Sequence, residues 1–206
     1  MGTSNNLIPI VSSNQEKWAS YSQNFQRYNR AKKSEFYLEC LWILYAMLED
    51  RTSSFLFYLG FTSNKKRSSV TGSKEIKKEV RDILKMVDSK EKYRFDSMYG
   101  KCERIQQLLL WSNTEVNADT SYKEAVLCAL SPLAERKELN EALDYLNGEW
   151  RDKRNQLTHA LFIKNPNAVV FELKPLVESG YKAVRVIDAA VREIKKKDIR
   201  SKFKIQ

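Results

Sequence analysis

Apolar residues recur at steps of three and four along most of the chain. The strongest such pattern covers residues 34–59, and Gly60 supplies a stop signal directly after it. Residues at these steps share one face of an α-helix, so a long amphipathic helix is expected here. The apolar face consists of Leu38, Leu41, Trp42, Tyr45, Leu48, Phe55, Leu56 and Leu59.

Similar patterns predict further helices. They cover residues 15–28, 74–87, 92–111, 121–130, 135–162 and 175–199. Pro132 is expected to end the helix before it, and Asn147-Gly148 to break or kink the 135–162 helix. The segment 165–167 reads as a turn, and the run 169–171 is compatible with a short strand. The aromatic residues at 18, 21, 25 and 28 are more typical of a core than of the alternative, base stacking.

Long helices joined by short loops predict an all-α fold, an up-and-down bundle of four to five long helices with short extra ones. Only six glycines and four prolines occur in 206 residues, too few for a β-rich protein with many turns. This length suits one core. We therefore expect a single domain over residues 1–206, loose at 1–14 and ending in a basic tail at 195–206.

The cysteine and histidine content argues against a structural metal. Cys40, Cys102 and Cys128 form no close-spaced pair, and the chain has one histidine, so no zinc site of ordinary ligand spacing can be assembled. Reduced thiols in the core fit a cytosolic location. No secretory signal opens the chain, and its longest apolar run is about half of a membrane span. A soluble cytoplasmic protein without a cofactor is expected.

The single histidine, His159, follows Arg154 by five residues. Histidine exchanges protons near neutrality, and arginine is a permanent planar cation suited to phosphate. Arg154 also falls on an apolar stripe between Trp150 and Leu157. A guanidinium there is costly unless it is paired or faces a polar cavity, and the alternative is an arginine whose head reaches solvent. The pair indicates chemistry on a phosphodiester.

The run Arg154-Asn155-Gln156-Leu157-Thr158-His159 resembles the Arg-polar-x-x-x-His motif of the HEPN superfamily (higher eukaryotes and prokaryotes nucleotide-binding domains). The resemblance implies an all-helical, metal-independent ribonuclease of a toxin–antitoxin or antiviral defence system. It also implies catalytic roles for Arg154, Asn155 and His159. Some antitoxin-linked members carry a nucleotidylated tyrosine shortly after the histidine, whereas this chain has Ala160-Leu161-Phe162 there.

The spacing of the motif raises a geometric question. Five residues at about 100° each leave Arg154 and His159 roughly 140° apart on a regular helix. They converge if the helix is irregular, if Arg154 reaches around, or if two copies meet across a two-fold axis. HEPN ribonucleases, which the sequence resembles, commonly build a composite site from two motifs. With one motif in the chain, a homodimer is implied.

The net charge of +10 favours a polyanionic partner such as RNA. For the basic run at the C-terminal end, a solvated helix end is the alternative to RNA contact. The candidate RNA-binding residues are Lys65, Lys66 and Arg67 in an expected loop, Arg151 and Lys153 beside the motif, and Lys195, Lys196 and Lys197.

An acidic group interrupts the apolar pattern of residues 34–59. Asp50 and Arg51 can face solvent, but Glu49 lies close to the buried stripe and needs a cation there. Arg154 is one candidate, which would make Glu49 a residue that orients the arginine. An unrelated surface ion pair is the alternative.

These residues predict a metal-independent endoribonuclease. The ribose 2′-hydroxyl attacks the phosphate, His159 moves protons, and Arg154 stabilises the phosphate charge. Asn155 hydrogen-bonds the phosphate or orients the imidazole. The products are a 2′,3′-cyclic phosphate and a 5′-hydroxyl. Two alternatives stay open: a non-catalytic helical module that binds RNA or protein, and a HEPN-like subunit that acts with another protein, such as an antitoxin or a defence-system partner.

Overall fold

The computed structural model describes residues 14–62, 73–87, 95, 97–115, 118–160, 163 and 165–205. Across these ranges the fold is all-α, without a strand, which confirms the predicted class. The expectations for residues 1–13 lie outside the described ranges, as do those for the basic loop at 63–72. The helices are α1 (Asn14–Lys33), α2 (Tyr37–Tyr58), α3 (Lys74–Val87), α4 (Met98–Thr114), α5 (Ser121–Ala134), α6 (Lys137–Tyr145), the π-helical turn η1 (Leu146–Trp150), α7 (Arg151–Ala160), α8 (Pro166–Lys196) and α9 (Ile199–Lys202).

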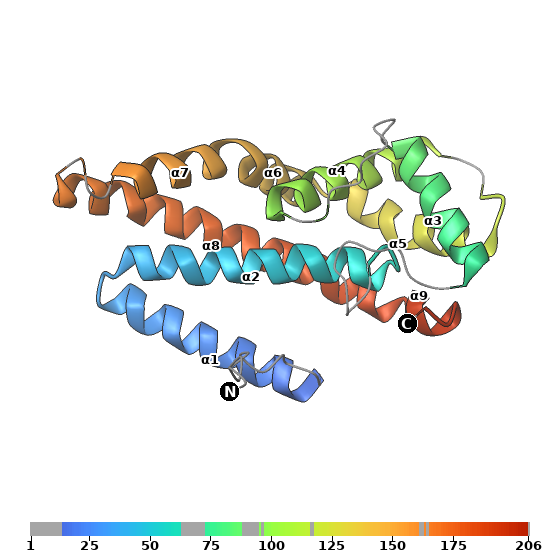
Figure 1. Cartoon of the computed structure of the whole chain (residues 1–206), viewed down its shortest axis with the longest axis horizontal. Coiled ribbons are helices and arrows are strands. Elements are labelled where there is room, and N and C mark those ends of the chain that lie inside the picture. Colours follow the sequence, from blue (N-terminus) through green and yellow to red (C-terminus); the bar gives the residue numbers. More distant parts are fainter. Residues whose placement is uncertain are drawn as a thin grey trace, which may run out of the picture.

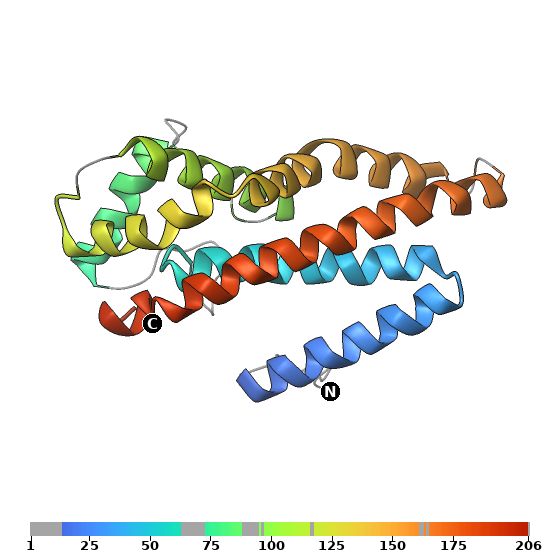
Figure 2. The same cartoon turned by 180° about the vertical axis from the view of Figure 1, so that it is seen from behind.

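Helices α2 and α8 pack against each other along most of their length and form the centre of the bundle (Figure 1). Helix α1 covers one side of α2, and α4, α6 and α7 cover the other side of the pair (Figure 2). Helices α3, α5 and α9 gather at one end of the molecule. Buried aliphatic residues fill the α2–α8 contact, among them Leu44, Leu48, Leu56, Val177, Val184, Ile187 and Val191.

Gly60 ends α2, as the sequence predicts. Its φ of +92° lies in the left-handed region, which glycine adopts without steric cost. The Gly60 amide donates to the Phe57 carbonyl at 2.9 Å, and the Phe61 amide donates to Leu56 at 3.0 Å. These two bonds satisfy carbonyls that the helix end leaves open.

Two prolines do not act as the sequence predicts. Pro132 lies inside α5, which continues to Ala134 because buried Leu133 and Ala134 hold the last turn in the core. Pro166 starts a helix: the Asn165 side chain accepts a hydrogen bond from the Asn167 amide at 2.9 Å, and proline fits the first helical position. The expected strand at 169–171 is therefore wrong, since these residues form the first turns of α8.

The basic tail expected at 195–206 is folded over residues 195–205, and Lys195, Lys196 and Lys197 are exposed at the end of α8, as in a solvated helix end. Ile199 and Ile205 are buried. Arg200 Nη1 donates to the carbonyls of Phe57 and Thr62, each at 3.0 Å, and the guanidinium lies 3.7 Å from the Phe57 ring centroid. The C-terminal segment therefore packs on the end of α2.

The predicted break at Asn147-Gly148 is the π-helical turn η1 between α6 and α7. Trp150, the last residue of this turn, is fully buried, and its Nε1 donates to the Leu176 carbonyl at 3.1 Å. Gly180 on α8 faces this indole, and a Cβ at position 180 would lie 2.9 Å from Nε1. Trp150 thus fixes the register of the helix that follows it.

Two of the three cysteines lie in the core. Cys40 and Cys102 are buried thiols, as expected, whereas Cys128 is exposed on α5 and is not part of the core. In the described ranges, the helices are too short or too polar to cross a membrane.

Candidate functional site

A shallow pocket of about 110 Å³ lies between the first half of α2 and α7. The three residues predicted as catalytic, Arg154, Asn155 and His159, all contribute to its wall. The complete lining is Leu41, Trp42 and Tyr45 from α2, with Arg154, Asn155, Thr158 and His159 from α7.

Helix α7 brings these side chains to one pocket without a distortion inside the motif. It is regularly α-helical from Arg151 to Ala160, and the irregular turn comes before Arg154. Arg154 and Thr158 form one i, i+4 row on the helix surface, and Asn155 and His159 form the neighbouring row. Both rows line the pocket, so Arg154 and His159 reach it from within one chain.

Arg154 is half-buried on aromatic faces. Its Cζ lies 4.6 Å from the centroid of Tyr45 and 5.6 Å from that of Tyr99. Its Nη2 donates to Asn155 Oδ1 at 2.6 Å. Its Nε is buried and, among the described residues, has no hydrogen-bond acceptor. The apolar stripe therefore accommodates the guanidinium by cation–π contact and leaves one charged donor open.

Tyr99, in the first turn of α4, lies beneath two arginines. Arg151 Cζ is 5.6 Å from its ring centroid, the same distance as Arg154 Cζ. Burial raises the pKa of Tyr99 to about 12, although Arg154 acts in the opposite direction. The phenol is therefore neutral at physiological pH and provides an uncharged platform for both cations.

His159 is the exposed member of the pocket. Because it is exposed, its imidazole is accessible from solvent, and no group in the described part of the chain hydrogen-bonds to it. Asn155 is exposed as well, and because its oxygen accepts from Arg154, its amide nitrogen is free to donate to a ligand. Thr158 Oγ1 donates to the Arg154 carbonyl at 2.8 Å.

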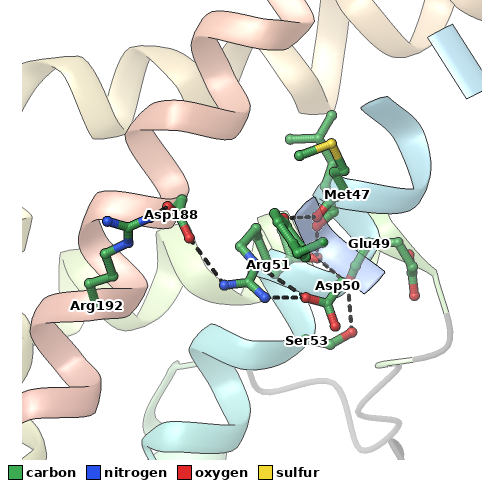
Figure 3. Close-up of polar contacts among 10 residues, drawn as sticks. Met47, Glu49, Asp50, Arg51, Ser53, Asp188 and Arg192 are labelled. Atoms are coloured by element: carbon green, nitrogen blue, oxygen red, sulfur yellow. Dashed lines mark hydrogen bonds and ion pairs between the residues drawn. The ribbon is translucent and has the colours of Figure 1, made fainter. Parts of the chain in front are cut away.

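The structure does not bring Glu49 to Arg154. Glu49 Oε1 instead forms an ion pair with Lys101 Nζ on α4. The pair is unrelated to Arg154, as the alternative expects, but it is not at the surface, because Lys101 is buried. Figure 3 shows Glu49 pointing away from the neighbouring Asp50–Arg51 pair.

Asp50 and Arg51 do not simply face solvent; they form a network that joins three helices (Figure 3). Arg51 Nε donates to Asp50 and its Nη1 pairs with Asp188 Oδ1 on α8, each at 3.1 Å. Its Cζ lies 4.3 Å from the ring centroid of Tyr21 on α1. Asp188 also pairs with Arg192 at 2.7 Å. This network ties α1 and α8 to α2.

The predicted RNA-binding residues divide into three groups. Arg151 and Lys153 flank the pocket on α7, where they pair with Asp152 at 3.0 Å and with Glu149 at 2.6 Å. The hydrogen bond that Lys153 donates to Glu149 raises the pKa of Lys153. The basic residues at the end of α8 lie at the opposite end of the bundle from α7 (Figure 1). These are Lys195, Lys196 and Lys197, whereas Lys65, Lys66 and Arg67 lie outside the described residues.

Sequence reasoning missed the aromatic half of the site. The apolar pattern places Trp42 and Tyr45 on the core face of their helix, yet both line the pocket, and Trp42 is exposed. The available signal was the step of three between two aromatic residues, which does not say which way they face.

In the described ranges, no three His, Cys, Asp or Glu side chains are grouped closely enough to hold a metal ion. Comparison of the chain with models of protein families finds no match, and comparisons with curated proteins and with solved structures find none either.

Proposed function

We propose that the protein is a HEPN-type endoribonuclease that cuts RNA without a metal ion. The observation that carries this proposal is the shared pocket of Arg154, Asn155 and His159. The pocket combines an exposed imidazole with a guanidinium that is held on the ring of Tyr45. The resemblance of residues 154–159 to the HEPN motif supports a toxin or antiviral defence setting, with an antitoxin or a defence-system protein as partner.

The chemistry uses a nucleophile that RNA itself supplies. The ribose 2′-oxygen forms a bond to phosphorus, its proton passes to a base, and the P–O5′ bond breaks as the 5′-oxygen takes up a proton. Arg154 stabilises the non-bridging oxygens of the pentacovalent state, and Asn155 donates a further hydrogen bond. The products are a 2′,3′-cyclic phosphate and a 5′-hydroxyl end.

Two proton transfers are needed, and each chain carries one histidine. In our proposal, His159 of one copy accepts the proton of the 2′-hydroxyl and His159 of a second copy supplies the proton to the 5′-oxygen. A two-fold homodimer would place both imidazoles at one phosphate. Exposed apolar residues support an interface near the pocket: Phe36 precedes α2, Ile163 follows α7, and Phe171 lies near the start of α8. These segments lie at the same end of the bundle (Figure 1).

The test is cleavage of an unstructured RNA in the presence of EDTA. His159→Ala and Arg154→Ala should each lower the rate at least about a hundredfold, as expected on losing a proton-transfer group or an oxyanion donor. Arg185→Ala, which removes an exposed arginine from α8, is the matched control and should leave the rate unchanged.

Product analysis and substrate analogues complete this test. The cut should leave a cyclic phosphate, and DNA and 2′-O-methyl RNA should resist cleavage because they lack a free 2′-hydroxyl. Cleavage that needs a divalent ion, or that survives in both pocket variants, would reject the proposal. If sedimentation shows a monomer and this monomer is fully active, the composite site is rejected but the nuclease proposal is not.

A further inference from the structure

Trp42 is the exposed aromatic side chain of the pocket. It is 60% exposed, whereas Trp111 and Trp150 are buried. Its neighbours on the same helix, Leu41 and Tyr45, complete the α2 wall of the pocket. The indole therefore presents a large flat surface next to the groups proposed to act on a phosphodiester.

The pocket is too small to enclose a nucleotide. Its volume is about 110 Å³, whereas pockets that enclose a small molecule usually measure about 300–1,000 Å³. It suits one polar group of a ligand whose remaining parts lie on the protein surface. The positive charge of the Arg154 guanidinium and the amide of Asn155, both in the pocket wall, select an anionic oxygen for that group. A nucleic-acid phosphate meets this description, and the base attached to its sugar then lies outside the pocket.

We infer that Trp42 is a stacking platform for an unpaired base beside the phosphate bound in the pocket, which makes single-stranded RNA the substrate class. This inference rests on the proposed function for the identity of the polymer. A stacking contact needs a base face that is free, and in duplex RNA both faces are covered by neighbouring bases. Stacking on an aromatic side chain tolerates any base, because every base has a π-face.

The surroundings of Trp42 favour a base over a second copy of the chain. The opposite wall of the pocket carries Arg154, Asn155, Thr158 and His159, which are charged or polar. The cores of protein interfaces are depleted of charged residues. The exposed apolar residues Phe36, Ile163 and Phe171 are instead outside the pocket lining and fit the proposed face between copies.

The test is equilibrium binding of a short unstructured RNA that is 2′-O-methylated throughout and therefore cannot be cleaved. Trp42→Ala should weaken binding about fivefold to a hundredfold, the range of one lost stacking contact. Trp42→Tyr keeps an aromatic face and should stay within about threefold of the unchanged protein. Leu110→Ala removes a similarly exposed apolar residue on α4, outside both the pocket and the proposed face between copies, and should have no effect. Circular dichroism checks that each variant is folded.

The outcomes separate this inference from the proposed function. If Trp42→Ala binds RNA as tightly as the unchanged protein, the stacking role is overturned, even if cleavage depends on His159. A Trp42→Tyr variant that binds RNA as weakly as Trp42→Ala overturns it as well. If Trp42→Ala binds RNA normally but sediments as a monomer where the unchanged protein is a dimer, Trp42 belongs to the interface between copies. That result also overturns the stacking role. If Trp42→Ala loses RNA binding and the unchanged protein never cleaves RNA, the stacking inference is supported and the proposed nuclease function is rejected. No RNA binding by the unchanged protein overturns both.

Discussion

The guanidinium of Arg154 lies over the ring of Tyr45, with 4.6 Å between Cζ and the ring centroid. This contact holds a cation on an apolar stripe without a carboxylate: within the described residues, Arg154 forms no ion pair. A carboxylate partner would compete with a phosphate for the same donors, whereas an aromatic ring leaves the edge of the guanidinium free. The contact with Tyr45 therefore positions Arg154 and leaves its charge available to a phosphate.

Removing the Tyr45 ring should therefore lower the proposed RNA cleavage. Tyr45→Leu loses the cation–π contact, worth about 0.5–2 kcal/mol, so we expect a rate roughly 2-fold to 30-fold lower. Tyr45→Phe keeps the ring face and should stay within about twofold. Initial rates on one RNA measure both. Tyr58→Leu is the control, because it removes a ring that lies 5.5 Å from Lys195 Nζ at the far end of α2. A Tyr45→Leu enzyme with an unchanged rate would contradict this role.

The contact between Gly180 and Trp150 predicts a large effect of one methyl group on stability. Gly180→Ala would place a Cβ 2.9 Å from Trp150 Nε1 and 3.4 Å from Leu44 Cδ1. Because both neighbours lie in the close-packed core, we expect a loss of about 1–3 kcal/mol in the free energy of unfolding. Gly148→Ala is the matched control, since a Cβ there meets nothing within 4 Å. Urea denaturation measures both, and equal midpoints would contradict the prediction.

Periodicity and stop signals predicted most of the fold. The pattern placed α3 at residues 74–87, ended the central helix at Gly60 and marked the break at Asn147-Gly148. It failed where a proline has two possible roles. Asn165-Pro166 reads as a turn by composition, but the same pair caps and starts a helix when apolar residues follow that pack on a core. Only the tertiary contacts decide between the two.

The residues of the candidate pocket were predictable on α7 and not on α2. Residues 154–159 carry their own chemical signal, and the structure brings the three expected side chains to one pocket. The α2 wall carries no such signal, because Trp42 belongs to the same apolar pattern as buried Leu41. Which of them is covered depends on the tertiary packing around α2, which the apolar pattern does not contain. The partner of Glu49 was equally hidden, since Lys101 is 52 residues away in the chain.

Thiol labelling should distinguish the three cysteines. In the native protein at pH 8, a thiol reagent should modify Cys128 quickly and leave Cys40 and Cys102 unmodified, because they are buried. Burial raises the pKa of Cys40 to about 11 and that of Cys102 to about 12, so neither is a thiolate at this pH. Mass spectrometry should therefore find one modification in the folded chain and three after unfolding. Rapid native labelling of Cys40 or Cys102 would contradict their place in the core.

The raised pKa values of Cys40 and Cys102 also predict that the folded protein loses stability at high pH. The ordinary pKa of a thiol is 9.0, so the unfolded chain releases these protons before the folded one does. The contribution of Cys40 and Cys102 is fully present below about pH 9 and is lost as the pH rises through 11 to 12. Cys102→Ala should flatten this decline in urea midpoints measured from pH 8 to 11. Cys128→Ala should not change it, since that thiol is exposed.

The ion pair between Glu49 and Lys101 predicts an unequal response to removing either charge. The Lys101 side chain is 2% exposed and that of Glu49 is 22% exposed. Glu49→Gln leaves an ammonium in the core without its carboxylate, and removing one partner of a buried pair costs about 3–5 kcal/mol. Lys101→Met leaves the carboxylate, which retains more contact with water, so the loss in the free energy of unfolding should be smaller.

These two variants also test whether Glu49 acts through Arg154. If the proposed RNA cleavage occurs, both should keep the unchanged rate at a temperature where they are fully folded, because Glu49 contacts Lys101 and Arg154 contacts Tyr45. A Glu49→Gln enzyme that is folded but at least tenfold slower would show that Glu49 positions the arginine after all. A folded Lys101→Met enzyme with the same defect would place the whole ion pair in that role, whereas a full rate in both assigns it to the core.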